Sequence, residues 1–200
     1  DGPLSVSDMR TRRDVCDAFI AAADEIGIPR NDDFNGKDQE GAGYFQLTLR
    51  KGRRCSTAVA YLNPVRSRPN LDIVTHASVE RLLFSSDEGR EVTGIAFSVK
   101  GTSRQATLKL GGETVLSAGA IGSPKILQIS GIGPGALLQD FGIPVRLEMP
   151  GVGENLQDHL QIRMIYQVNV PTLNDEINNF FRRMRIGMEY VLFRTGPMAM

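Results

Sequence analysis

The residues best suited to binding a ligand form a run of small side chains, Ser117-Ala118-Gly119-Ala120. The preceding residues favour a short buried strand over Thr114–Ser117. Ser123 and Pro124 are typical of the N-cap and first residue of a helix, and Gly131 of its C-terminal stop. Small residues after a strand let a large ligand approach the backbone, and a helix N-terminus directs N–H groups at an anion. The pattern predicts an anion-binding turn, with an ordinary tight turn as the alternative.

The two histidines, His76 and His159, are the side chains that could accept a hydroxyl proton near neutral pH. His76 lies at the end of a predicted strand. His159 follows Asn155 and Asp158, which are residue types that hydrogen-bond to nearby backbone and fix turns. We therefore predict no catalytic residue within this chain.

Three pairs of neighbouring carboxylates could in principle act as general acid and base. They are Asp32-Asp33, Asp87-Glu88 and Asp175-Glu176. Each pair lies in polar sequence typical of turns, which predicts solvated loops rather than acid/base pairs.

Regular elements must hold these residues in place. A helix is predicted over Ser7–Ile26, with Gly27 as its stop, and another over Ala58–Leu62 after Ser56 or Thr57. A further helix is predicted from Arg182 to Phe193. The predicted strands are Tyr44–Leu49, Leu71–Thr75, Val79–Ser85, Val92–Lys100, Gln105–Leu110, Thr114–Ser117 and His159–Val170.

The three strands between Val79 and Leu110 are joined by short polar turns, one of them at Ser86–Arg90. Parallel strands require long crossover connections, so these three are predicted to form an antiparallel meander. The flanking strands, Leu71–Thr75 and Thr114–Ser117, are then free to join a parallel sheet. Any α/β domain with a hairpin insertion has the same order of elements and stays as an alternative.

Several stretches resemble one enzyme family. The run from Gly119 to Gly133, GAIGSPKILQISGIG, resembles the second signature of the glucose–methanol–choline (GMC) family of FAD-dependent oxidoreductases. The stretch GVGENLQDH at Gly151–His159 follows where the family has a similar motif. Further similar stretches are NG and QEGAGYFQ within Asn35–Gln46, GRRCSTA and YL within Gly52–Leu62, and RPNL with Thr75 and Val79.

The resemblance implies a cofactor and a reaction. It implies FAD, with the backbone of Val79 at the adenine end and with Ser117, Ala118 and Gly119 lining the flavin or the pyrophosphate. It also implies choline-dehydrogenase-like oxidation of an alcohol to an aldehyde or ketone, by hydride transfer to the flavin.

The fold class implied is mixed α/β. Residues 1–50 would be a portion of the substrate domain, 51–158 a portion of a reductase-type FAD-binding domain, and 159–200 the start of a second substrate-domain segment. The substrate-binding part would combine an antiparallel sheet with helices. No G-x-G-x-x-G motif follows a predicted strand. The resemblance implies that the dinucleotide fingerprint and the active-site histidine lie outside this internal fragment. The alternative is that the isolated chain is a non-catalytic scaffold or binding module.

Composition limits the classes of partner and the cellular location that we expect. Lys and Arg number 23, as do Asp and Glu, so charge gives no reason to propose nucleic acid as a partner. Cys16 and Cys55 show neither metal-ligand nor redox spacing, and we expect free thiols and a cytoplasmic location. No apolar run approaches the roughly 20 residues that span a bilayer. The basic stretch Arg182–Arg185 leaves a membrane-surface helix, with contact to a membrane quinone, as an alternative.

Overall fold

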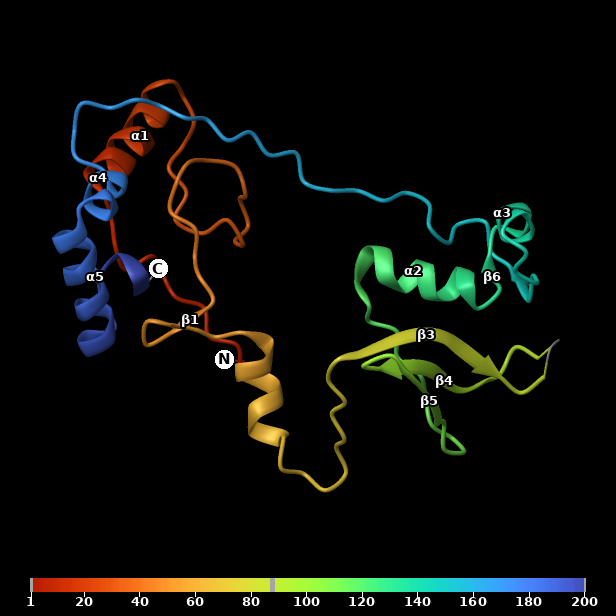
Figure 1. The fold of residues 1–200 in the computed structure, drawn as a ribbon. Coiled ribbons are helices and arrows are strands. Elements are labelled where there is room, and N and C mark those ends of the chain that lie inside the picture. The colour runs from red at the N-terminus through yellow and green to blue at the C-terminus, as the bar shows by residue number, and fades with distance from the viewer. Residues whose placement is uncertain (1, 87–88, 200) are drawn as a thin grey trace. The chain divides into compact units, whose positions relative to one another are not determined.

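A computed structural model describes residues 2–86 and 89–199 and divides the chain into two compact units. Unit 1 contains the described residues of 1–71 and 164–200, and unit 2 contains residues 72–163. The two units are described separately below, and Figure 1 shows their elements.

Unit 1 is built mainly from helices. Its elements are α1 (Asp14–Glu25), β1 (Leu49–Arg50), β2 (Arg53–Arg54), the π-helix η1 (Ala58–Leu62), the 3-10 helix η2 (Asn63–Val65), α4 (Leu173–Asn178), α5 (Phe180–Phe193) and the 3-10 helix η3 (Pro197–Ala199). Strands β1 and β2 pair antiparallel. The buried apolar residues are Ile20, Ala23, Leu49, Cys55, Ala60, Ile186 and Ala199.

The predicted helices of unit 1 form, with two changed starts, since α5 begins at Phe180 rather than Arg182. Helix α1 begins at Asp14 rather than Ser7, because the backbone of Arg13 is still extended. Ser7 instead exchanges two backbone hydrogen bonds with Leu47, of 2.9 and 2.8 Å. The predicted stop at Gly27 is confirmed by its φ of +87°.

Two other predictions in unit 1 have mixed outcomes. The helix over Ala58–Leu62 has the predicted bounds, and Ser56 Oγ accepts a hydrogen bond from Val59 N at 3.3 Å. The strand predicted over Tyr44–Leu49 is wrong in extent, because regular pairing is limited to the bridge at Leu47 and to β1.

The predicted meander is confirmed in unit 2. Strands β3 (Ala77–Phe84), β4 (Val92–Val99) and β5 (Thr102–Thr107) form one antiparallel sheet in the order β3-β4-β5. Asp87 and Glu88, within the first predicted turn, lie outside the described residues.

Helix α2 (Gly119–Ile129) packs along β3, and Figure 1 shows the two elements running in the same general direction. Ser130, which follows the helix, is buried and ties the two together. Its Oγ accepts from Leu82 N at 2.9 Å and donates to Ile126 O at 2.6 Å. The C-terminal end of α2 is therefore fixed to the sheet.

Three predicted strands do not form. Leu71–Thr75, Thr114–Ser117 and His159–Val170 are not strands, and none of them pairs with a strand of the described chain. A strand is stabilised by hydrogen bonds to a neighbour, so an apolar or alternating pattern without a partner remains irregular. The first two segments were predicted to join a parallel sheet of a larger domain, and the described residues do not test that part, which stays a prediction.

The parallel pairing lies elsewhere in unit 2. Strand β6 (Ile132–Gly133) pairs parallel with β7 (Leu147–Glu148), and α3 (Gly135–Asp140) lies in the connection. A Cβ on Gly131, at φ +86°, would lie 2.6 Å from the carbonyl oxygen of Pro144. The tight turn from α2 into β6 therefore requires glycine.

Both cysteines are free thiols, with Cys16 exposed and Cys55 buried. Within the part of the chain that the structure describes, no helix is long and apolar enough to cross a membrane.

Candidate functional site

The candidate site is built around the first turn of α2. The helix begins at Gly119, not at Pro124 as predicted, and Ala118 is its N-cap residue. Ser123 was predicted to be the N-cap, but it lies inside the helix, where its Oγ accepts a hydrogen bond from Ala118 N at 3.0 Å. Pro124 has no N–H to donate to the carbonyl of Ala120, four residues earlier. The helix thus starts with three small residues in place of a polar cap.

The predicted cofactor residues lie on two elements of unit 2. Ser117, Ala118 and Gly119 are exposed at the start of α2. Gly119 has φ +87°, and a Cβ built on it would meet nothing within 4 Å. Val79 lies on β3 and is 37% exposed. The backbone at Gly119 is therefore open to a bulky ligand, in a conformation that favours glycine.

The other α-helices have their N-termini supplied with acceptors or acids, as the positive end of a helix requires. These groups are Asp14 and Asp17 in α1, the Glu148 carboxylate at Gly135 N of α3, the Thr172–Asp175 capping box of α4 and Asn179 Oδ1 at Arg182 N of α5. Helix α2 has no side-chain cap and no acid in its first turn. Among the described α-helices, α2 is the one whose first turn has neither a side-chain cap nor an acidic residue beside its N–H groups.

A cleft of about 560 Å³ lies beside this helix. Its lining combines one face of α2 with the turn after β7. The lining residues are Ala120, Ile121, Pro124, Lys125, Gln128, Gly153, Glu154, Asn155, Leu156 and Gln157. The fold thus brings together the two stretches, from Gly119 and from Gly151, that the sequence analysis identified separately.

The sequence analysis missed two polar residues of the cleft, Lys125 and Gln128. A signal was present, because Ile121 and Lys125, like Pro124 and Gln128, are four residues apart and share a helix face. None of the four predicted cofactor residues lines this cleft: Ser117, Ala118 and Gly119 directly precede Ala120, which does, and Val79 lies on β3.

Neither histidine lies in the cleft. His76 is exposed, with φ +55°, immediately before β3. His159 is exposed in irregular chain, where its backbone N–H donates to Asp158 Oδ1 at 2.8 Å. Asp158 thus makes the local backbone hydrogen bond expected of it.

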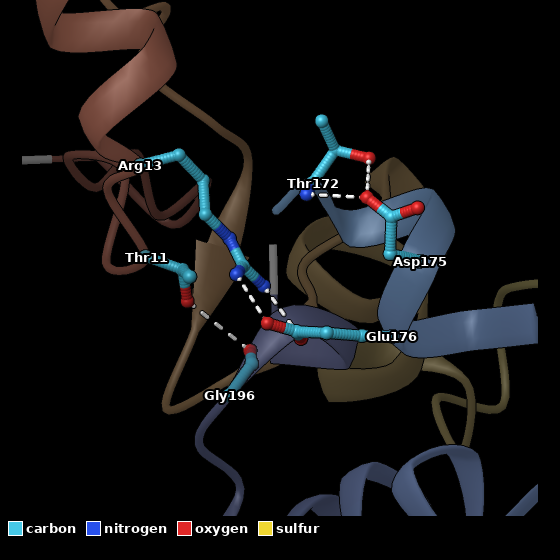
Figure 2. A network of polar contacts seen from close by, with 6 residues as sticks. All are labelled: Thr11, Arg13, Thr172, Asp175, Glu176 and Gly196. Carbon is cyan, nitrogen blue, oxygen red and sulfur yellow. Dashed lines mark hydrogen bonds and ion pairs between the residues drawn. The ribbon is translucent and has the colours of Figure 1, made fainter. Parts of the chain in front are cut away.

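One carboxylate pair lies in a helix and not in the predicted loop. Asp175 and Glu176 lie in the first turn of α4, and Figure 2 shows the polar network around them. Glu176 accepts from Arg13 at 2.7 and 3.1 Å, and Asp175 Oδ2 accepts from N and Oγ1 of Thr172 at 2.7 and 2.8 Å. Thr11 Oγ1 donates to Gly196 O at 3.2 Å in the same network.

These contacts lower the pKa of both carboxyl groups. The hydrogen bond from Arg13 lowers the pKa of Glu176, and the Thr172 backbone N–H lowers that of Asp175. Both groups are therefore held ionised by structural contacts, which does not suit a general acid. The spacing Thr172-x-x-Asp175 resembles a capping box and could have indicated the helix start.

Comparisons with known proteins find similar sequences. A family model for GMC oxidoreductases matches residues 1–161. An oxygen-dependent choline dehydrogenase from Burkholderia vietnamiensis is 42% identical over 198 residues, covering 98% of this chain and 34% of that protein.

Solved structures are similar as well. An FAD-dependent oxidoreductase from Chaetomium thermophilum matches with a TM-score of 0.87 and 30% identity, over 100% of this chain and 34% of that one. A pyridoxine 4-oxidase from Mesorbium loti matches with a TM-score of 0.71 and 35% identity, over 79% of this chain and 30% of that one. The chain spans about a third of the length of these relatives.

Proposed function

Because this chain belongs to the GMC oxidoreductase family, we propose that it forms part of an FAD-dependent enzyme that oxidises an alcohol to an aldehyde or ketone. Unit 2 would supply part of the FAD site. The observation that carries this proposal is the uncapped N-terminus of α2 beside the open backbone of Gly119. Choline is the first substrate to test, since choline dehydrogenases are among the relatives.

The residues of unit 2 fit a dinucleotide in three respects. The N–H groups of the first turn of α2 would stabilise the negative pyrophosphate. These N–H groups are available because the first turn contains no acidic residue. Gly119 lacks a side chain where the cofactor would pass, and Ser117 and Ala118 are small. Val79 would place its backbone at the adenine end of the cofactor.

FAD supplies the redox chemistry when bound, by accepting the hydride of the alcohol carbon. The residues of this chain orient and hold the cofactor. We place the proton-accepting group outside this chain, since neither His76 nor His159 lines the cleft. Residues 51–158 are proposed as the FAD-binding portion, and residues 1–50 and 159–200 as substrate-domain portions.

The test uses the purified whole protein and its visible absorbance spectrum. Flavin bands that bleach when choline or another alcohol is added under anaerobic conditions would support the proposal and identify the substrate. A protein that carries no flavin after purification and reconstitution with FAD would overturn it. The noncatalytic scaffold would then be the better interpretation.

A further inference from the structure

We propose that Gln128 is a positioning residue, which holds the segment 151–157 against α2 and so sets the shape of the cofactor cleft. This inference rests on the proposed FAD site. Gln128 lies on the face of α2 that lines the cleft, and its Nε2 donates to the carbonyl oxygen of Val152 at 3.0 Å. A side chain in the last turn of the helix is thereby joined to the turn that follows β7.

Two glycines leave room for this side chain. A Cβ on Gly153 would lie 2.7 Å from Gln128 Nε2, and a Cβ on Gly133 would lie 3.1 Å from Gln128 Cγ. Glycine on both sides lets the backbone of β6 and of the turn approach the amide closely. The side chain is therefore confined along its length as well as bonded at its tip.

The turn held by Gln128 leads directly to the cleft. Val152 N donates to Met149 O at 3.1 Å and Glu154 N to Gly151 O at 3.3 Å, while Met149 N donates to Gly133 O at 3.0 Å. Asn155 follows in a left-handed conformation, with φ +55°. The side of the cleft opposite α2 is lined by Asn155, Leu156 and Gln157. The hydrogen bond at Val152 therefore fixes the position of the chain just before these three residues.

The role requires a donor at this position. Gln128→Leu has a similar size but cannot donate to Val152 O. Gln128→Glu keeps the shape, but an ionised carboxylate would face the carbonyl oxygen with no proton to share. Gln139→Leu is the matched control, because Gln139 is an exposed glutamine on the neighbouring helix α3.

The first readout needs no activity and no flavin. Hydrogen exchange of the peptide 149–157 in the apoprotein of the whole enzyme should be about tenfold faster in Gln128→Leu, as expected for one lost hydrogen bond of ordinary strength. FAD should dissociate more readily by a similar factor, measured by recovery of flavin fluorescence. Gln139→Leu should change neither quantity.

A pH profile separates positioning from a general loss of stability. In Gln128→Glu, the introduced carboxyl can donate to Val152 O once it is protonated. The protection of peptide 149–157, relative to intrinsic exchange rates, should therefore recover as the pH falls from about 7 to about 5, because an ordinary Glu pKa is near 4.3 and a facing carbonyl raises it. Gln128→Leu should show no such recovery.

A double-mutant cycle provides a second, independent measurement. Gly133→Ala should speed exchange at 149–157, because the new Cβ would press on Gln128 Cγ. In a Gln128→Ala background the same change should be tolerated, since that Cγ is gone. Additive effects would contradict confinement of Gln128 by Gly133.

The results distinguish the two proposals. Unchanged exchange and unchanged FAD binding in Gln128→Leu would overturn the positioning role, although the wild-type protein binds flavin. Faster exchange in a protein that never binds FAD would leave Gln128 as a clamp and overturn the proposed function instead.

Discussion

Helices α2 and α3 of unit 2 begin in opposite ways. At α3, both oxygens of the Glu148 carboxylate accept from Gly135 N, at 3.0 and 2.9 Å. At α2, the corresponding position is occupied by small exposed residues and no acid. The same requirement, to satisfy N–H groups at the positive end of a helix, is met internally at α3 and left open at α2.

The difference is informative because each of the two helices begins with a glycine. Gly135 is buried, and the carboxylate of Glu148 occupies the space where its Cβ would lie. Gly119 is exposed, and the space around it is open. At α3 the glycine lets a side-chain carboxylate approach the helix N-terminus closely, and at α2 the open space around the glycine is where we propose that a ligand binds.

The largest effect is expected from closing the open N-terminus sterically. Gly119→Val places a β-branched side chain at φ +87° and in the proposed path of the cofactor. Backbone strain of about 1–3 kcal/mol, together with the steric block, should lower the FAD content of the whole protein at least about tenfold. The measurement is flavin released per mole of purified protein.

A matched glycine controls for strain alone. Gly142 has φ +68°, and its Cβ would also meet nothing within 4 Å, but it follows α3. Gly142→Val should lower the melting temperature as much as Gly119→Val does while retaining FAD. Equal flavin loss in both variants would show that strain, and not access to the α2 N-terminus, is responsible.

A smaller effect is expected from giving α2 the acid that it lacks. Ala120 and Ala136 occupy the second position of α2 and of α3, and both are exposed. Ala120→Glu should weaken FAD binding about three- to tenfold at low salt, because the new carboxylate competes with the pyrophosphate for the N-terminus of α2. A negative charge near a helix N-terminus is stabilised by about 0.3–1 kcal/mol or more. Titration of apoprotein with FAD measures this.

Ala136→Glu is the control on the closed helix and should leave the affinity for FAD unchanged. Added salt should reduce the effect of Ala120→Glu, since exposed charges are screened. If affinity falls equally in both variants, the two N-termini do not differ in function.

Opening α3 should affect stability and not the cofactor. In Glu148→Gln the charge at the α3 N-terminus is lost, and we expect a destabilisation of about 0.5–1 kcal/mol. The measurement is the melting temperature of the whole protein with FAD content as a second readout. Glu113→Gln, at an exposed position in irregular chain, should change neither; a loss of FAD in Glu148→Gln would contradict the assignment of α3 as a closed structural end.

The sequence predicted those features of the fold that depend on local patterns. The meander over Val79–Leu110 and the glycine stops at Gly27 and Gly131 follow from alternation, turn residues and backbone preference, and all three are present. The strands at Leu71–Thr75 and Thr114–Ser117 were wrong, because pairing is a property of two segments and a single segment does not reveal its partner. The two-residue strands β6 and β7 are too short to produce any periodicity.

The sequence analysis identified the two stretches that meet at the cleft, whereas its four cofactor residues do not line the cleft and stay a prediction. Small residues at Ala118 and Gly119 gave a physical reason for an anion site, and family resemblance added FAD. The sequence could not show that Gln128 reaches Val152, which requires the turn at Gly151 to fold back on α2. It also could not show that the Glu148 carboxylate accepts a hydrogen bond at the N-terminus of α3, because Glu148 and Gly135 belong to separate elements.

The smallest effect is expected at a closed N-terminus in unit 1, where Glu176 of α4 pairs with Arg13 (Figure 2). Its pKa is lowered from the ordinary value of 4.5 by that hydrogen bond. A carboxyl whose pKa is lower in the folded state stabilises the fold above the ordinary pKa, and the contribution is lost as the pH falls through the lowered value. The melting temperature of Glu176→Gln should therefore lie below that of the wild type at pH 7, and the two should converge below about pH 4.

Glu40→Gln, at an exposed loop position, controls for the change in net charge and should show no such convergence. A difference between Glu176→Gln and wild type that widens toward acid would contradict the sign derived for the ion pair. The effect is modest because both partners are partly exposed, and ion pairs near the surface contribute little. The ion pair beside the capped N-terminus of α4 should thus respond to pH, whereas the open N-terminus of α2 should respond to FAD.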